Sequence, residues 1–433
     1  MRLREAAPSA SRLRRGAPLL IAGVLVLAIN LRAAITGLPP LFPELQSALH
    51  VSAATLALLA AMPVLCFGVF SGAGAPLSRR LGEERVLGLS LGLLAAGLLV
   101  RSLSPGTLLF PGTIAAGAAI ALMNVLLPSL VKRRMPDHAG VVIGLYLLML
   151  TAGAVVASLI AVPVFTAAGG GLTPGSAAVR ISLGLWAGPA LLAVLIWLPQ
   201  LRHRTVPELP GPAGAGLARL ARPRGAAALT RSPLAWQVTL FIGLQSLSYY
   251  ATLSWFPTMF RDRGVSAAHA GDLLALMNLG NAATALLIPM LAQRVTDQRS
   301  LAVVANVATA LGLMGAFFGP ASAAVPAIVL LGLGQGATLG LGIFYTMARA
   351  PDAVTAASLS AFAQSIGYLI ASLGPLVIGF LHHATGGWAA SGLLLVAVAA
   401  AQLVTGWLAG RAKTVPARSA GPPGGESQAY GLG

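Results

Sequence analysis

Few residues in this sequence could do chemistry, and most of them interrupt long apolar segments. Arg32 stands in an apolar run that spans about residues 17–43, roughly 22 Å from its start if the run is helical. A charge at that depth in a bilayer costs at least about 2.5 to 3.5 kcal/mol, so it should face a partner or a wet cavity. A guanidinium offers planar, paired donors to a small oxyanion or pseudohalide. We therefore interpret Arg32 as a candidate anion-binding residue; the alternative is that it snorkels to the interface or caps backbone carbonyls.

Other apolar segments carry polar stripes at helical spacing. Gln245, Ser248, Tyr249 and Thr252 follow i, i+3, i+4 and i+7, and Ser360, Gln364 and Tyr368 follow i, i+4 and i+8. Such stripes can line a cavity, or they can simply hydrogen-bond neighbouring helices. The predicted substrate-binding residues are Arg32, Asn124, Gln245, Tyr249, Gln335, Gln364 and Tyr368.

Two further polar residues in apolar runs are assigned to other environments. Asn30 lies about 200° around the helix from Arg32, so one of the two should pack against a neighbouring helix. Arg101 reaches a depth similar to that of Arg32 on another predicted span.

The residue inventory argues against an enzyme. The six histidines fall in loops or near the ends of apolar runs, the apolar runs lack interior carboxylates, and Cys66 is the single cysteine. General acid–base and metal chemistry need such groups close together. Gly334-Gln335-Gly336 is not in a strand-turn-helix unit, and neither lysine belongs to a P-loop. We therefore predict no catalytic residue, no metal and no cofactor.

The elements that position these residues are membrane-spanning helices. Of 433 residues, 57% are hydrophobic and 9% are charged, and the mean hydropathy is +0.83, which suits an all-α membrane protein. Twelve apolar runs of spanning length are predicted, near residues 17–43, 54–77, 86–104, 107–131, 140–166, 179–199, 233–260, 267–292, 300–318, 324–348, 355–381 and 388–410.

The basic residues orient these spans. If the N-terminus is cytoplasmic, the cytoplasmic segments hold 23 of the 28 Lys and Arg residues, so the positive-inside rule places both termini in the cytoplasm. The net charge of +17 then needs no nucleic-acid partner. The sequence predicts five parts: a cytoplasmic N-terminal segment (1–16), a six-helix half (17–200), a flexible Pro/Gly/Arg-rich linker (201–232), a second six-helix half (233–411) and a disordered cytoplasmic tail (412–433).

The two halves repeat each other weakly. At an offset of 214, Phe42-Pro43 pairs with Phe256-Pro257, Ser52 with Ser266, and Arg80 with Arg294. Two pseudo-symmetric six-helix halves typically enclose a substrate site near the bilayer midplane and expose it alternately to each side. One chain already supplies such a site, so we expect a monomer.

Several segments resemble the major facilitator superfamily, and within it the cyanate/nitroimidazole transporter family. They are Asn30 to Thr36, Met62 to Phe67, Asn124 to Pro128 leading to Lys132-Arg133, Trp197 to Gln200, and Gln364 to Tyr368. The superfamily usually has an acidic residue before Arg and Gly in the loop between spans 2 and 3. Here Arg79-Arg80-Leu81-Gly82 stands there, and the resemblance marks Arg79, Arg80 and Gly82 as gating-loop residues. The usual acidic contact is either missing or supplied by another residue. The span that carries Arg101 is peripheral in the resembled fold, so we expect the Arg101 side chain to extend to the membrane interface.

The resemblance implies a secondary active transporter that moves a small anion or a small polar, weakly acidic, cyanate-like solute by alternating access. The alternative is efflux of nitroimidazole-like or other small organic drugs. No Asp, Glu or His relay is evident in the spans, which leaves facilitated diffusion, exchange, or proton coupling through the substrate's own protonation or a group near the cavity mouth. Of these, the expected mode is proton-linked symport or uniport. With 26 Arg, 2 Lys and abundant Ala and Gly, the expected location is a bacterial inner membrane.

Overall fold

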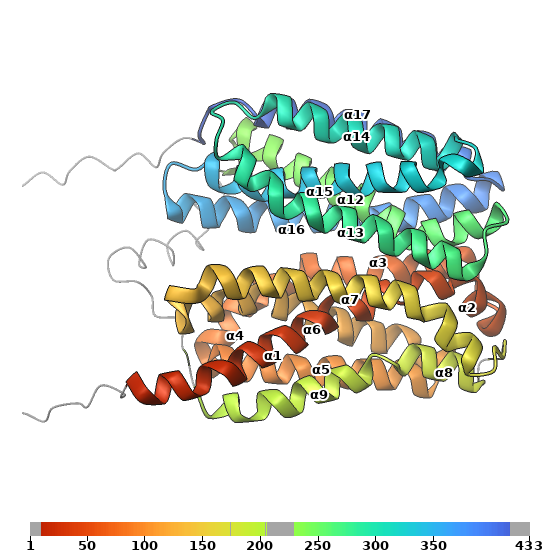
Figure 1. The fold of residues 1–433 in the computed structure, drawn as a ribbon, viewed down its shortest axis with the longest axis horizontal. Helices are drawn as coiled ribbons and strands as arrows, with labels where there is room; N and C mark the ends of the chain where they lie inside the picture. Colours follow the sequence, from red (N-terminus) through yellow and green to blue (C-terminus); the bar gives the residue numbers. More distant parts are fainter. Residues whose placement is uncertain (1–9, 174, 204, 206–228, 416–433) are drawn as a thin grey trace, which may run out of the picture.

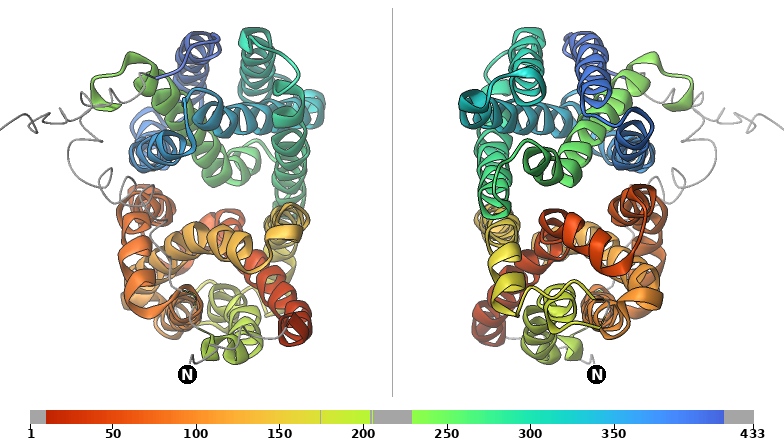
Figure 2. Two further views of the ribbon diagram at one scale, coloured as in Figure 1. Left: turned by 90° about the vertical axis from the view of Figure 1, so that its left-hand side faces the viewer. Right: turned by 90° about the vertical axis from the view of Figure 1, so that its right-hand side faces the viewer.

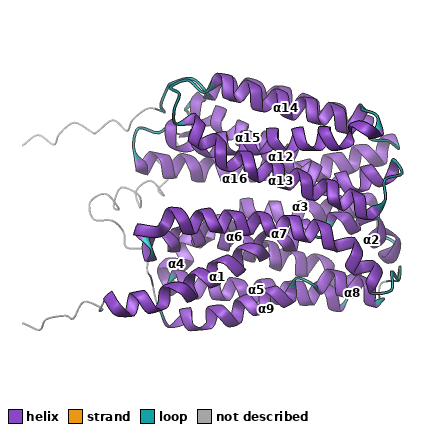
Figure 3. Ribbon diagram, viewed as in Figure 1, coloured by secondary structure: helices purple, strands orange, loops and turns teal. Residues whose placement is uncertain are grey.

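The computed structural model describes residues 10–173, 175–203, 205 and 229–415. This part of the chain is helical and contains no strand (Figure 3). Residues 1–9, most of the predicted linker and the tail after Val415 lie outside the described residues, so their predicted flexibility and disorder remain predictions.

The first predicted half is built from helices α1 to α9, with short 3-10 turns between some of them (Figure 1). Their bounds are α1 Ala10–Thr36, α2 Phe42–Leu49, α3 Ala53–Phe70, α4 Gly74–Leu81, α5 Glu83–Leu103, α6 Pro105–Arg134, α7 Ala139–Ala167, α8 Ala177–Gly184 and α9 Ala187–Trp197. The second half comprises α12 Pro233–Asp262, α13 Ala267–Ala292, α14 Arg299–Phe318, α15 Ala324–Ala348, α16 Ala353–Thr385 and α17 Ala389–Ala409.

Eleven helical segments among the described residues are long and apolar enough to cross a membrane. Helix α12 has the length of a span, at 30 residues, and corresponds to the seventh predicted one. Its mean hydropathy is lower because Gln245, Ser248 and their polar neighbours occupy its middle. Together these helices make the all-α architecture of twelve spans predicted from the sequence.

The repeat in the sequence has a structural counterpart in the caps of two helices. Ser52 caps α3 by accepting a hydrogen bond from Thr55 N, and Ser266 caps α13 by accepting one from His269 N. A serine hydroxyl at this position satisfies one of the unpaired amides of the first helical turn. The paired residues Ser52 and Ser266 therefore start equivalent spans in the two halves.

The halves meet along two helix pairs, α3 with α16 and α7 with α13 (Figure 2). Small residues permit the close approach: a Cβ on Gly271 of α13 would lie 2.7 Å from Ser158 O of α7. Close backbone contact through small residues is the usual way in which membrane helices associate.

One end of the bundle, where α2 and α8 lie, is far from the start of α1, and the other end holds the end of α9 and the start of α12, the helices on either side of the predicted linker (Figure 1). We refer to it as the opposite end, and to the other as the linker end. At the opposite end Arg261 of α12 makes a 2.7 Å ion pair with Glu44 of α2, and the rings of Phe42 and Trp255 are 5.8 Å apart. These contacts join the two halves and close the opposite end.

Candidate substrate-binding site

A cavity of about 280 Å³ lies between the halves. Eight spans contribute to its wall: α1, α3, α6 and α7 from the first half, and α12, α13, α15 and α16 from the second. The polar and aromatic lining residues are Arg32, Phe67, Asn124, Tyr146, Thr151, Tyr249, Tyr250, Asn278, Asn281, Gln364 and Tyr368.

Arg32 joins the two halves in this cavity. Its Nη1 donates a 3.4 Å hydrogen bond to Tyr249 Oη, and Tyr249 Oη donates to Asn278 Oδ1 at 2.8 Å. The guanidinium carbon lies 5.4 Å from the centre of the Tyr249 ring and 6.0 Å from that of Tyr250. The hydroxyl hydrogen of Tyr249 is used by Asn278, so its oxygen can accept from Arg32.

Among the residues that the structure describes, the charge of Arg32 has no carboxylate partner. None of the ion pairs formed by the described residues includes it, and no Asp or Glu lines the cavity. A half-buried cation with only a phenol and ring faces around it is poorly compensated, because hydrogen bonds to neutral groups do not cancel its charge. An anion in the cavity would supply the missing charge.

Aromatic rings form a wall beside this charge. Phe67 of α3 makes edge contacts with Tyr250 at 6.4 Å and Tyr368 at 5.5 Å, and Tyr249 contacts Tyr250 at 5.2 Å. Such edge-to-face pairs hold ring orientations and present apolar faces to the space between them. The cavity therefore combines one fixed cation with flat apolar surfaces, which suits a small unsaturated anion.

The structure brings five of the seven predicted binding residues into this cavity: Arg32, Asn124, Tyr249, Gln364 and Tyr368. Asn124 accepts a 3.4 Å hydrogen bond from Tyr146 Oη, and Gln364 Nε2 donates to Ser360 Oγ at 2.8 Å. Gln245 instead lines an adjoining cavity of about 80 Å³, which shares Gln364 and Tyr368 with the larger one.

Gln335 lines neither of these cavities. Its side chain is 1% exposed, and its Nε2 donates to Ser248 Oγ and Thr252 Oγ1, both at 3.2 Å. The polar stripe on α12 is thus divided: Ser248 and Thr252 bind α15, while Tyr249 faces the cavity. This is the helix-packing use of a polar stripe, which the spacing alone could not separate from cavity lining.

Tyr146 and Thr151 of α7 line the cavity and were not among the predicted residues. The sequence held a signal for both, because Tyr146 is the one aromatic residue in the stretch 140–164 and Thr151 is one of its two hydroxyl residues besides that tyrosine. Asn278 and Asn281 of α13 also contribute amides to the wall.

The two residues assigned to other environments have different outcomes. Asn30 is fully buried and donates from Nδ2 to Val26 O at 2.9 Å, so it does pack away from the face that carries Arg32. Arg101 does not reach the interface as expected: it is 2% exposed, and its Nε donates to Leu183 O at 3.0 Å. The break between α8 and α9 leaves carbonyls at the end of α8, and Arg101 binds one of them inside the bundle.

The predicted gating-loop residues lie at the linker end. Arg79 and Arg80 occupy the exposed last turn of α4, and buried Gly82, with a φ of +91°, turns the chain into α5. Acidic side chains follow directly: Glu84 pairs with Arg134 at 2.8 Å, within the same half. A gating role for these three residues stays a prediction.

Comparisons with known proteins identify the family to which this architecture belongs. The family model described as Major Facilitator Superfamily matches residues 23–375 and 242–428. The chain is 40% identical to the 2-nitroimidazole transporter of Escherichia coli strain K12, over 92% of this chain and 96% of that one. It is 30% identical to the cyanate transport protein CynX of the same strain, over 84% and 90%. The crystal structure of a D-xylose-proton symporter superposes with a TM-score of 0.71 at 15% identity, over 94% of this chain and all of that one.

Proposed function

The chain belongs to the major facilitator superfamily and is a multi-pass membrane transporter, not an enzyme, and on this premise we propose that it moves a small, unsaturated, monovalent anion or weak acid by alternating access. The two moving bodies are residues 17–200 and 233–411, and the central cavity is the binding site. We place the protein in a bacterial inner membrane with both termini in the cytoplasm, as a monomer.

The observation on which the proposal rests is the position of the Arg32 guanidinium and its lack of an ion pair among the described residues. The guanidinium lies between the halves, contacts Tyr249 of the other half, and has no carboxylate partner among the described residues. An anion bound there would contact groups of both halves. Its binding energy could therefore be coupled to their relative motion.

The substrates named for two relatives fit one chemical class. Cyanate is a small anion with delocalised charge, and 2-nitroimidazole is a small flat ring whose N–H is weakly acidic. Both can accept hydrogen bonds from a guanidinium and lie against aromatic rings. A cavity of about 280 Å³ with one arginine and a Phe/Tyr wall suits solutes of this kind.

The proposed coupling is proton symport or uniport of the anion. No Asp or Glu lines the cavity, so a proton would travel with the substrate itself or bind near the cavity mouth. Uptake that ignores an imposed pH gradient at a clamped membrane potential would exclude symport.

The direct experiment measures saturable uptake of labelled cyanate and labelled 2-nitroimidazole into proteoliposomes. Arg32→Ala should abolish or strongly weaken uptake, and Arg32→Lys should retain part of it because the charge remains but the planar pair of donors is lost. Arg180→Ala is the matched control, because Arg180 is exposed and lies outside the cavity. Uptake with equal KM in the Arg32→Ala and unchanged proteins would refute an arginine-centred site.

Efflux of nitroimidazole-like or other small drugs is the second candidate. The aromatic wall and the relative named as a 2-nitroimidazole transporter favour it. Direction distinguishes the two functions. An exporter should concentrate 2-nitroimidazole inside everted vesicles when energised, whereas an importer should concentrate it inside right-side-out vesicles.

A further inference from the structure

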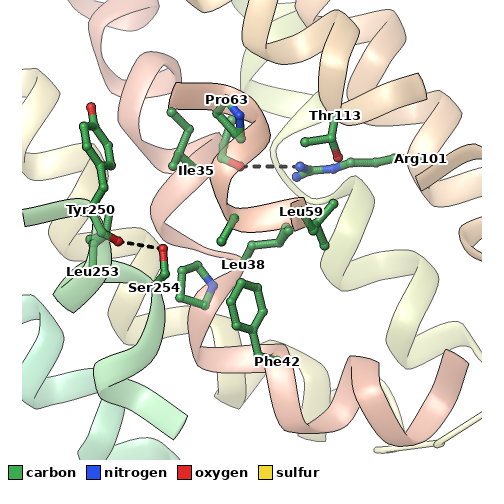
Figure 4. Close-up of a pocket in the computed structure, with 13 residues that line it drawn as sticks. Ile35, Leu38, Phe42, Leu59, Pro63, Arg101, Thr113, Tyr250, Leu253 and Ser254 are labelled. Atoms are coloured by element: carbon green, nitrogen blue, oxygen red, sulfur yellow. Dashed lines mark hydrogen bonds between the residues drawn. The ribbon is translucent and has the colours of Figure 1, made fainter. Parts of the chain in front are cut away.

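A second, much smaller cavity has a volume of about 20 Å³ (Figure 4). Leu38, between α1 and α2, and Phe42, at the start of α2, line it, so it lies nearer the opposite end than the central cavity does. Tyr250 lines both cavities and stands between them. The wall is mostly aliphatic or aromatic, formed by residues such as Ile35, Leu38, Phe42 and Leu59. Its polar side chains besides Tyr250 are those of Arg101, Thr113 and Ser254.

The guanidinium of Arg101 points into this cavity (Figure 4). It is 2% exposed, and it uses Nε and Nη1 to donate to Leu183 O at 3.0 Å and Ala34 O at 3.5 Å. Both carbonyls lie in the last turn of a helix, where the helix dipole places partial negative charge. These bonds hold the side chain in position but leave Nη2 buried without a partner.

The positive charge of Arg101 is also not matched by a carboxylate. The ion pairs of the described residues do not include Arg101, and no acidic side chain lines the small cavity. The hydroxyls of Thr113 and Ser254 donate their hydrogens to Leu109 O and Tyr250 O, respectively. Besides the hydroxyl of Tyr250, the donor that remains for a ligand in this cavity is Nη2 of Arg101, which belongs to a charged group.

We propose that the small cavity binds one monatomic anion, chloride under cellular conditions, on Nη2 of Arg101. A cavity needs roughly 10–15 Å³ of this measure to hold a water, so about 20 Å³ admits one water or one halide ion and excludes anions of three or more heavy atoms. A halide is favoured over water because its negative charge compensates that of the buried guanidinium, and because a buried water needs two to four polar partners, which this mostly apolar wall does not offer. The site is thus separate from the proposed substrate site at Arg32.

The wall of the small cavity comes from both halves. Leu253 and Ser254 belong to α12, whereas the residues around Arg101 belong to α1, α3, α5 and α6. The cavity is complete while the halves meet at the opposite end, as they do in this structure. A bound halide would stabilise that closed state and set the conformational equilibrium without being carried.

The test is halide-dependent thermal stability of the purified protein. Sodium gluconate is replaced stepwise by sodium chloride or bromide at constant ionic strength, because gluconate is too large for the cavity. The unfolding temperature should rise by several degrees and then saturate, as expected for a ligand that binds the folded state alone. The same shift should appear in Arg32→Ala, because that residue lies in the other cavity.

Two variants remove the site by different routes. Arg101→Met deletes the charge, and Ala60→Val fills the space from the wall while leaving Arg101 in place. Both should lose the saturable halide shift, and Arg180→Met should keep it because Arg180 is exposed on the surface. If Arg101→Met does not fold, Ala60→Val decides the outcome.

Bromide-soaked crystals identify the occupant directly. An anomalous peak within hydrogen-bond distance of Arg101 Nη2 is expected. A water without anomalous signal there, or a halide shift that survives Ala60→Val, would overturn the proposal. Neither result would affect Arg32-dependent uptake, so failure of this inference and failure of the proposed function can be told apart.

Discussion

Breaking the ion pair between Glu44 and Arg261 should shift the transporter toward a state that is open at the opposite end. This pair joins α2 of the first half to α12 of the second at 2.7 Å, and Arg261 also donates to Pro40 O at 3.4 Å. The variant Glu44→Gln keeps the size of the side chain and removes its charge. Alternating access requires the halves to separate at this end, so the closed state should lose stability relative to the open one.

The size of the shift follows from the burial of the pair. The side chains of Arg261 and Glu44 are 23% and 12% exposed, so the pair lies between an exposed one, worth about 0.2 to 1 kcal/mol, and a fully buried one, whose disruption costs about 3 to 5 kcal/mol. We expect about 1 to 2 kcal/mol here, which changes the ratio of closed to open molecules roughly 5- to 30-fold.

Pulsed electron resonance between spin labels on Gln46 and Ala268 measures that ratio, with Cys66 replaced first. Both labelled positions are exposed and lie at the opposite end, one in each half. Glu44→Gln should enlarge the long-distance population, and the reversed pair Glu44→Arg with Arg261→Glu should restore the short one.

Asp297→Asn is the matched control, because Asp297 pairs with Arg299 at 3.5 Å within the second half and at the linker end. A distance distribution that Glu44→Gln leaves unchanged, or that Asp297→Asn alters equally, would show that the pair does not hold this end closed.

Three further substitutions test the site and the packing around it. Tyr249→Phe removes the hydroxyl that accepts from Arg32 and donates to Asn278. The KM for anion uptake should therefore rise about 3- to 10-fold, the equivalent of one hydrogen bond. An unchanged KM would contradict this contact. Gly336→Ala would press a Cβ into Asn281 O and should lower the unfolding temperature markedly, whereas Gly92→Ala, with open space around it, should not. Equal thermal shifts would refute the close approach of α13 and α15. Gln335→Leu should lower the free energy of unfolding by about 1 to 3 kcal/mol. It should leave the KM for uptake unchanged, because the Gln335 amide binds α12 outside the cavities. A raised KM in a stable variant would show that Gln335 belongs to the substrate site.

Much of the architecture could be read directly from the sequence. The length of each apolar run is a local property, and a bilayer admits a helix of about 20 such residues, so the spans and their order follow without knowledge of tertiary contacts. The paired residues Ser52 and Ser266 are likewise local signals, because a serine caps the helix that begins beside it. The missing carboxylate near Arg32 was also predictable, since no Asp or Glu occurs in the interior of a predicted span and Asp272 lies near the end of its span.

The tertiary structure decided which neighbour each polar side chain meets. Helical periodicity gives the angle between two residues of one helix, but not the rotation of that helix toward the others. For this reason the spacing on α12 could not show that Ser248 faces Gln335 while Tyr249 faces Arg32. The peripheral position of its span in the resembled fold suggested that Arg101 reaches the interface, yet the ends of α1 and α8 meet it inside the bundle. Those contacts join residues 67 and 82 positions apart, and only the packing of whole helices brings them together.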